Sequence, residues 1–234
     1  MGSELAPVCV GVDVGQITDP MAIAVAEVKQ IATGKYRYNR DQQPARYDAK
    51  AGWIPPQGVI PVMVADYTIR YMQRLPLGTS YPDAAIFLAE LLCNSLFIGR
   101  QVRLLMDVTG VGRPVYDDLR KEAKLRKEVQ RVLIKPISFV HGETYNKRTG
   151  SLGKAFLVSR LQSLLQNRRL HAPETEEVKA TMEELRVYQR KISQNGVDTY
   201  GAKTGAHDDL ATALGLACLE NPFAEQVSYS RRVY

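Results

Sequence analysis

The chain has 234 residues, of which 45% are hydrophobic and 24% are charged, with 17 glycines and 12 prolines. This composition excludes a collagen-like repeat, a low-complexity chain and a wholly disordered one, and the length allows a sizeable buried core. The formal net charge is +6, which favours polyanionic partners such as nucleic acid. No apolar run approaches the roughly 18 residues that span a bilayer, and we expect neither a signal peptide nor a membrane partner.

The first part of the chain predicts a β-hairpin and a third strand. Apolar, β-branched runs at 8–14 and 21–29 flank the linker GQITDP, which has the Gly, Asp and Pro of a tight turn. Segment 32–56 is polar and turn-rich, so we expect an insertion or a long excursion there, with a short extra strand at 36–38. Residues 59–72 are expected to form the third strand.

Helices and strands alternate through the rest of the chain. Two further apolar runs predict strands, and the intervening segments have the apolar spacing of helices. The last helix is apolar on nearly all sides and is therefore expected to be buried. The expected elements are a helix at 81–97, a strand at 102–108, a helix at 114–126, a strand at 129–140, a polar loop at 141–150, and helices at 153–168, 174–190 and 208–219.

This order of elements predicts an α/β fold with a mixed sheet of about five main strands, the first three antiparallel, and helices on both faces. It is the order of the RNase H-like fold. We expect one domain over 8–221, interrupted by the 32–56 insertion. Residues 1–7 are interpreted as a tag or linker remnant, and 222–234 as a C-terminal tail.

Acidic residues occupy special places in this pattern. Asp13 lies in the first apolar strand, Asp107 ends the strand at 102–108, and Asp208 and Asp209 open the last helix. A charge in an apolar strand is costly unless it is paired or bound to a cation. Asp208 alone would also be explained as a helix cap. Taken together, the acids predict a site for Mg²⁺ or Mn²⁺, because hard oxygen ligands suit these ions, and two such ions can clamp a phosphodiester.

Four segments resemble the nuclease domain of the terminase large subunit of tailed bacteriophages. They are GVDVGQITDPMAIAV, LLMDVTGVGRPVYDDL, YNKRTGSLGKAFLVSRLQSLLQNRRL and YGAKTGAHDDLATALGLA, in the order of the family. The resemblance implies an RNase H-like fold related to Holliday-junction resolvases. It also implies two-metal endonuclease activity on double-stranded DNA, with Asp13, Asp107 and one or both of Asp208 and Asp209 as ligands.

The same resemblance implies a packaging role in the cytoplasm of an infected bacterium. The expected partners are an N-terminal ATPase domain of the full-length protein, the portal protein and the small terminase subunit. This chain has no G-x-x-x-x-G-K-[ST] motif, so we expect the motor to lie outside it.

Further residues are candidates for supporting roles. His207 precedes the acid pair and is a candidate to orient water or contact phosphate, or simply to form a hydrogen bond at the helix entry. Lys147 and Arg148 lie in the polar loop and are candidate DNA contacts. Because Asp209 begins the run DLATALGLA, similar to the resolvase pattern DALAxA, we expect Asp209 to be the more direct metal ligand, with Asp208 serving a second metal, a water or the cap.

Two other functions fit parts of the sequence. VGVDVGQ followed by a hairpin resembles the first phosphate-binding turn of sugar kinases and actin-like ATPases. However, 234 residues are too few for the two full lobes of that class. A DNA-clamping module without catalytic activity is the other alternative, against which the complete set of acids argues.

Overall fold

The computed structural model describes residues 5–15, 19–38, 46–50, 52–54, 58–190 and 208–223. The chain divides into two compact units, one formed by Lys29–Asp66 and the other by the segments before and after it. The larger unit contains all of the acids that the sequence singles out.

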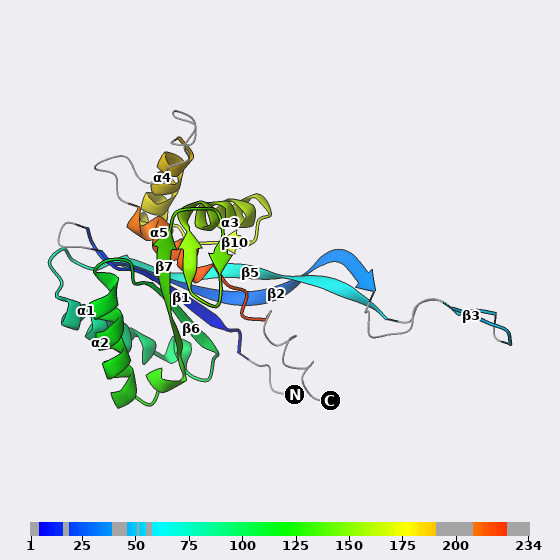
Figure 1. Ribbon diagram of the computed structural model, residues 1–234, viewed down its shortest axis with the longest axis horizontal. Coiled ribbons are helices and arrows are strands. Elements are labelled where there is room, and N and C mark those ends of the chain that lie inside the picture. Colours follow the sequence, from blue (N-terminus) through cyan, green and yellow to red (C-terminus); the bar gives the residue numbers. More distant parts are fainter. Residues whose placement is uncertain are drawn as a thin grey trace. The chain divides into compact units, whose positions relative to one another are not determined.

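The larger unit is built on a mixed β-sheet (Figure 1). Its strands lie in the order β10-β5-β2-β1-β6-β7-β9-β8. β1 pairs antiparallel with β2 and parallel with β6, and β6 pairs parallel with β7. The strand bounds are Val8–Asp13 (β1), Ala22–Tyr38 (β2), Val59–Arg74 (β5), Val102–Asp107 (β6), Leu133–Val140 (β7), Tyr145–Asn146 (β8), Ser151–Gly153 (β9) and Leu170–His171 (β10).

Helices cover both faces of this sheet, as the sequence predicts. Side chains of a strand alternate between its faces, so Leu104 packs with α1 and α2 while the adjacent Leu105 packs with α3 and α5. Each side has its own core, and strands β1 and β6 lie between them. The helix bounds are Tyr81–Leu92 (α1), Gly112–Leu125 (α2), Lys154–Gln166 (α3), Glu176–Arg190 (α4) and Asp209–Ala217 (α5).

Gly11 allows α5 to lie directly on β1. A Cβ atom at this position would lie 2.0 Å from the Ala213 carbonyl oxygen and 2.4 Å from the Ala217 nitrogen. Only glycine therefore permits this approach of strand and helix. Every residue of α5 is buried, which confirms the expectation from its apolar sequence. This packing places the first residues of α5 at the end of β1.

The unit Lys29–Asp66 corrects one prediction. The expected separate strand at 36–38 is wrong, because β2 continues without a break from Ala22 to Tyr38. Residues 29–37 are exposed, so neither face of this part of β2 is buried. A strand is recognised in a sequence by alternating apolar and polar residues, and an exposed strand does not need that alternation. Within the predicted insertion, β3 (Arg46–Asp48) and β4 (Gly52–Ile54) form a short antiparallel pair. The predicted domain limits stay a prediction.

Three other boundaries differ from expectation. The helix predicted at 81–97 ends at Leu92 and is followed by a 3-10 turn at Ser95–Phe97, where the Asn94 side chain accepts from the Leu96 N–H. The strand predicted at 129–140 begins with a 3-10 turn, Val129–Arg131, before β7. The loop at 141–150 includes the short strand β8. In each case local hydrogen bonds between a few residues set the end of the element. The spacing of apolar residues does not encode such bonds.

No helix in the described ranges is both long enough and apolar enough to cross a membrane.

Candidate functional site

The four predicted acids converge at one edge of the sheet. Asp13 and Asp107 end the neighbouring parallel strands β1 and β6, so their carboxylates come to the same edge. Asp208 immediately precedes α5, and Asp209 is its first residue. All four line a cavity of about 380 Å³. Asp13, Asp107 and the pair Asp208–Asp209 lie at least 94 positions apart in the sequence and share one cavity, as the fold prediction required.

The cavity disfavours negative charge on its deepest acids. Burial raises the pKa of Asp13 well above its usual value, and the nearby carboxylates of Asp107 and Asp208 raise it further. Burial also raises the pKa of Asp107, against the opposing effect of hydrogen bonds from Thr109. The Thr109 N–H donates to Asp107 Oδ1 at 2.7 Å and fixes that carboxylate. An added cation would relieve this repulsion.

Lys154 brings a positive charge into the cavity. Its Nζ lies 3.1 Å from Asp208 Oδ2 and 5.6 Å from the centroid of the Phe139 ring. Sequence reasoning missed this residue. A signal was present, because a lysine in the first position of a helix is opposed by the helix dipole and needs a compensating partner.

Arg74 binds the other acid of the pair. Its Nε donates to Asp209 Oδ2 at 2.7 Å, its second guanidinium nitrogen donates to Asp209 Oδ1 at 3.1 Å, and it also pairs with Glu184 of α4. Glu184 in turn accepts the Ala211 N–H at 2.8 Å. Burial raises the pKa of Glu184 to about 7. Arg74 and Glu184 were also missed, although a buried acid on the inner face of α4 was a usable signal.

The contacts distinguish the two adjacent acids. Asp209 is only 5% exposed and is held by a bidentate pair with Arg74. Asp208 is more exposed to the cavity, and it acts more strongly than Asp209 on the pKa of Asp13. Asp208 occupies the N-cap position of α5, yet its side chain makes no capping hydrogen bond. The contacts therefore tie Asp209 to Arg74 and Asp208 to Lys154, while both acids line the cavity, and which of them is the more direct metal ligand stays a prediction.

The donor set fits a hard divalent cation. Carboxylate oxygens of Asp13, Asp107 and Asp208 line the cavity, and such oxygens suit Mg²⁺ and Mn²⁺. In the described residues, however, no three His, Cys, Asp or Glu side chains already converge as a ready-made metal site. The pairing of Lys154 with Asp208 gives a physical reason, since it directs one carboxylate towards a protein cation.

The predicted DNA contacts lie outside this cavity, on the turn between β8 and β9. Lys147 and Arg148 are exposed there, and they are not among the residues that line the cavity. The Asn146 side chain accepts from the Arg148 N–H at 3.0 Å and from the Thr149 N–H at 3.3 Å, which shapes the turn. His207 lies outside the described residues.

A buried ionic cluster holds β8 in place. Glu220, which follows α5, accepts from Lys135 Nζ of β7 at 2.5 Å and from the Tyr145 hydroxyl of β8. Arg103 of β6 lies 3.5 Å from the same carboxylate. Together these contacts join the end of α5 to the strands that carry the turn with Lys147.

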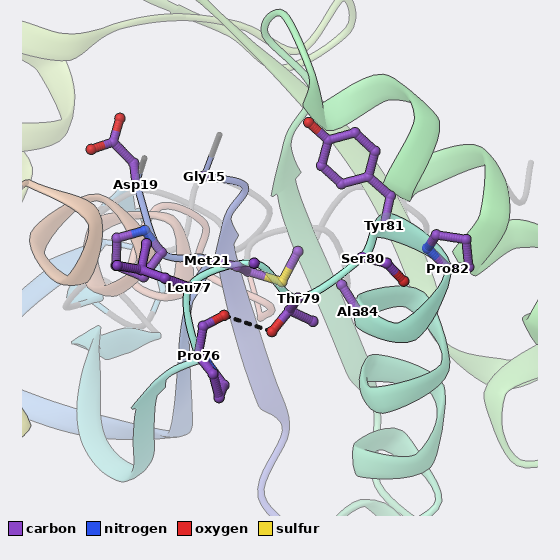
Figure 2. A pocket seen from close by; sticks show the side chains of 12 residues that line it. Gly15, Asp19, Met21, Pro76, Leu77, Thr79, Ser80, Tyr81, Pro82 and Ala84 are labelled. Carbon is purple, nitrogen blue, oxygen red and sulfur yellow. Dashed lines mark hydrogen bonds between the residues drawn. The ribbon is translucent and has the colours of Figure 1, made fainter. Parts of the chain in front are cut away.

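A second, mostly apolar cavity of about 410 Å³ adjoins the acidic one (Figure 2). The two share Gly15, Asp19 and Pro20 as lining residues. Figure 2 shows Met21 and Leu77 on one side and Tyr81 at the start of α1 on the other. No lysine or arginine is among its described lining residues, so the acidic cavity with Lys154 is the better candidate for phosphate chemistry.

The sheet order, with helices on both faces and acids at the ends of β1 and β6, defines the chain as an RNase H-like domain. The sequence matches the terminase RNase H-like domain family over residues 83–221, and the chain belongs to that family. This confirms the family and the fold that the sequence predicts. None of the curated proteins that were compared matches the sequence.

Solved structures agree on the fold. The human cytomegalovirus terminase nuclease domain aligns with a TM-score of 0.52 at 13% identity, covering 95% of this chain and 86% of that one. A second structure of that domain, described as Mn soaked, aligns with a TM-score of 0.50 at 14% identity, covering 95% and 88%. At such low identity the likeness establishes a shared fold.

Proposed function

We propose that this chain is a metal-dependent endonuclease that hydrolyses phosphodiester bonds of double-stranded DNA during viral genome packaging. The observation that carries the proposal is the single cavity lined by Asp13, Asp107, Asp208 and Asp209, brought together from three distant segments. Membership of the terminase RNase H-like family supports the same activity.

Asp13, Asp107 and Asp208 would hold two divalent ions, Mg²⁺ or Mn²⁺. Such ions supply Lewis-acid stabilisation of a phosphodiester oxygen and activate water. The related cytomegalovirus domain was soaked with Mn, which supports the choice of ion. Burial raises the pKa of Asp13 and of Asp107, nearby carboxylates raise that of Asp13 further, and a bound cation would favour the charged form of both acids.

The surrounding residues position these ligands. The Thr109 N–H fixes the Asp107 carboxylate, and the Thr109 hydroxyl oxygen accepts the Phe139 N–H of β7 at 2.8 Å, which ties Thr109 to that strand. Arg74 holds Asp209, and through it the first turn of α5, so that Asp208 faces the cavity. Because these supports come from the sheet and from packed helices, the ligands are held before substrate arrives.

DNA binding is assigned mainly to electrostatic contacts. Lys147 and Arg148 on the exposed β8–β9 turn are the proposed phosphate contacts, and the net charge of +6 favours a polyanion. We assign the ATPase domain, the portal protein and the small terminase subunit as partners in packaging, in the cytoplasm of an infected bacterium.

Plasmid nicking tests the proposal. Asp13→Asn and Asp107→Asn should each lower the Mn²⁺-dependent nicking rate by roughly a thousandfold or more, because a lost ligand removes several kcal/mol of transition-state stabilisation. Asp117→Asn is the matched control, since Asp117 is an exposed acid of α2 that pairs with Arg113. Its nicking rate should equal that of the wild type.

Wild-type nicking by Asp13→Asn would refute the assignment of the site. If the wild-type chain binds DNA but never nicks it at any Mn²⁺ concentration, the clamping module becomes the better description.

A further inference from the structure

Lys154 stands apart from the other cations near the acidic cavity. It begins α3 and lines the cavity, with its Nζ 3.1 Å from Asp208 Oδ2 and its ammonium over the Phe139 ring. The side chain is 35% exposed, so its charged end reaches both the acids and solvent. A lysine stem is flexible and its ammonium is a point charge, so it can change partners without a fixed bonding geometry.

The backbone fixes where this lysine begins. Gly153, the residue before it, lies so close to the Gly142 carbonyl oxygen that a Cβ would come within 1.9 Å of that oxygen. Only glycine fits, so the start of α3 is pinned against the loop after β7. The first turn of α3 contains no acidic residue, and its N-cap provides no side-chain hydrogen bond. The positive end of this helix therefore adds to the charge of Lys154 at the rim of the cavity.

Arg74, the cation that binds Asp209, is held more firmly than Lys154. Its guanidinium is shared between Asp209 and Glu184, both under 10% exposed, and it binds Asp209 through two nitrogens. A bidentate pair with a buried carboxylate is not readily exchanged. Lys154 meets Asp208 through one ammonium–carboxylate contact, and the Asp208 side chain is about one-fifth exposed, so this ion pair opens more easily than the bidentate pair of Arg74 and Asp209.

We infer that Lys154 is the resident counter-ion of the acidic cavity, that it leaves Asp208 when a divalent cation enters, and that it then binds a phosphate oxygen of the DNA. The inference rests on the proposed function. The ammonium and a divalent cation repel each other and compete for the Asp208 carboxylate. Once displaced, the ammonium is still held at the rim by the fixed start of α3, where an incoming phosphate supplies a new negative partner.

Two measurements on the full chain test this inference. The first is Mn²⁺ affinity by isothermal titration calorimetry without DNA, for the wild type, Lys154→Met and Lys121→Met. Lys121 is the matched control, because it is an exposed lysine of α2 paired with Asp118. We expect Lys154→Met to bind Mn²⁺ about twofold to fivefold more tightly, the range for a partly exposed ion pair that no longer competes, and Lys121→Met to match the wild type.

The second measurement is the nicking rate at saturating Mn²⁺. Lys154→Met should nick at least tenfold more slowly than the wild type despite binding metal more tightly, and Lys121→Met should be unchanged. A higher Mn²⁺ affinity together with a lower nicking rate in Lys154→Met supports the inference. Unchanged or weaker Mn²⁺ binding by Lys154→Met overturns the counter-ion role, and wild-type nicking by that variant overturns the phosphate contact.

The two proposals fail in different ways. If the wild-type chain itself neither binds Mn²⁺ nor nicks DNA, the proposed function falls and this inference falls with it. If the wild type does both and Lys154→Met behaves like Lys121→Met, only the inference is overturned.

Discussion

Replacing Arg74 with methionine isolates the charge that joins β5, α4 and α5. Methionine keeps an apolar stem of similar length but leaves the carboxylates of Asp209 and Glu184 buried together without their shared cation. Removing one partner of a buried ion pair costs about 3–5 kcal/mol. Arg74 is itself 32% exposed, so water would replace part of the lost interaction, and we expect a loss of about 3 kcal/mol.

This loss converts to a measurable change in melting temperature. In a chain of this size, each kcal/mol shifts Tm by about 2–4 °C, so Arg74→Met should melt roughly 6–12 °C below the wild type. The assay is thermal denaturation followed by circular dichroism in a metal-free buffer with chelator. Arg186→Met is the control, since Arg186 pairs with Glu183 on the exposed face of the same helix α4, and it should cost under about 1 kcal/mol.

The pH dependence separates lost charge from lost packing. The pKa of Glu184 is raised to about 7, mainly by burial, while Arg74 acts to lower it. Because the folded state then holds this proton more tightly than the unfolded state, its contribution to stability falls as pH rises from about 4.5 to about 7. Without Arg74 the fall becomes larger, so the loss of Tm should be greater at pH 8 than at pH 5. A variant that melts within about 2 °C of the wild type at both pH values refutes this account of Arg74.

Three other expectations follow from the same geometry. Asp208→Ala should not nick DNA at any Mn²⁺ concentration, whereas Asp209→Ala should be less stable yet partly active; a Mn²⁺ titration of nicking rates that shows the opposite order would restore Asp209 as the ligand. DNA affinity should fall steeply with salt in filter binding, and the double replacement of Lys147 and Arg148 by alanine should reduce the slope of log K against log salt by about 2; a flat dependence in the wild type contradicts this. Gly11→Ala should lower the free energy of unfolding in urea by about 3 kcal/mol or more, because its Cβ has no space against α5, and a loss below about 1 kcal/mol would show that α5 can move away.

Much of the framework was open to prediction because burial leaves a local pattern. β1 and β6 lie inside the sheet, so both are mostly apolar, and an acid at the end of such a run stands out. The last helix read as buried because it is apolar on all sides, and every residue of α5 is buried. Where burial is absent the pattern fails, as in the exposed half of β2, which sequence reasoning replaced with a turn-rich insertion.

Charge pairing in the cavity follows no such local rule. Lys154 meets Asp208 across 54 positions, and Arg74 meets Asp209 across 135, so neither pair could be read from spacing. The sequence by itself was enough to predict the central strands of the sheet, the buried last helix and the acids at the ends of these elements. Each of these features depends on the polarity of residues that are neighbours in the chain. Only the tertiary structure decided which cation holds which acid: Lys154 pairs with Asp208, and Arg74 pairs with Asp209. These pairings join segments far apart in the sequence, and α5, which carries Asp209, is positioned by its close packing on β1 at Gly11.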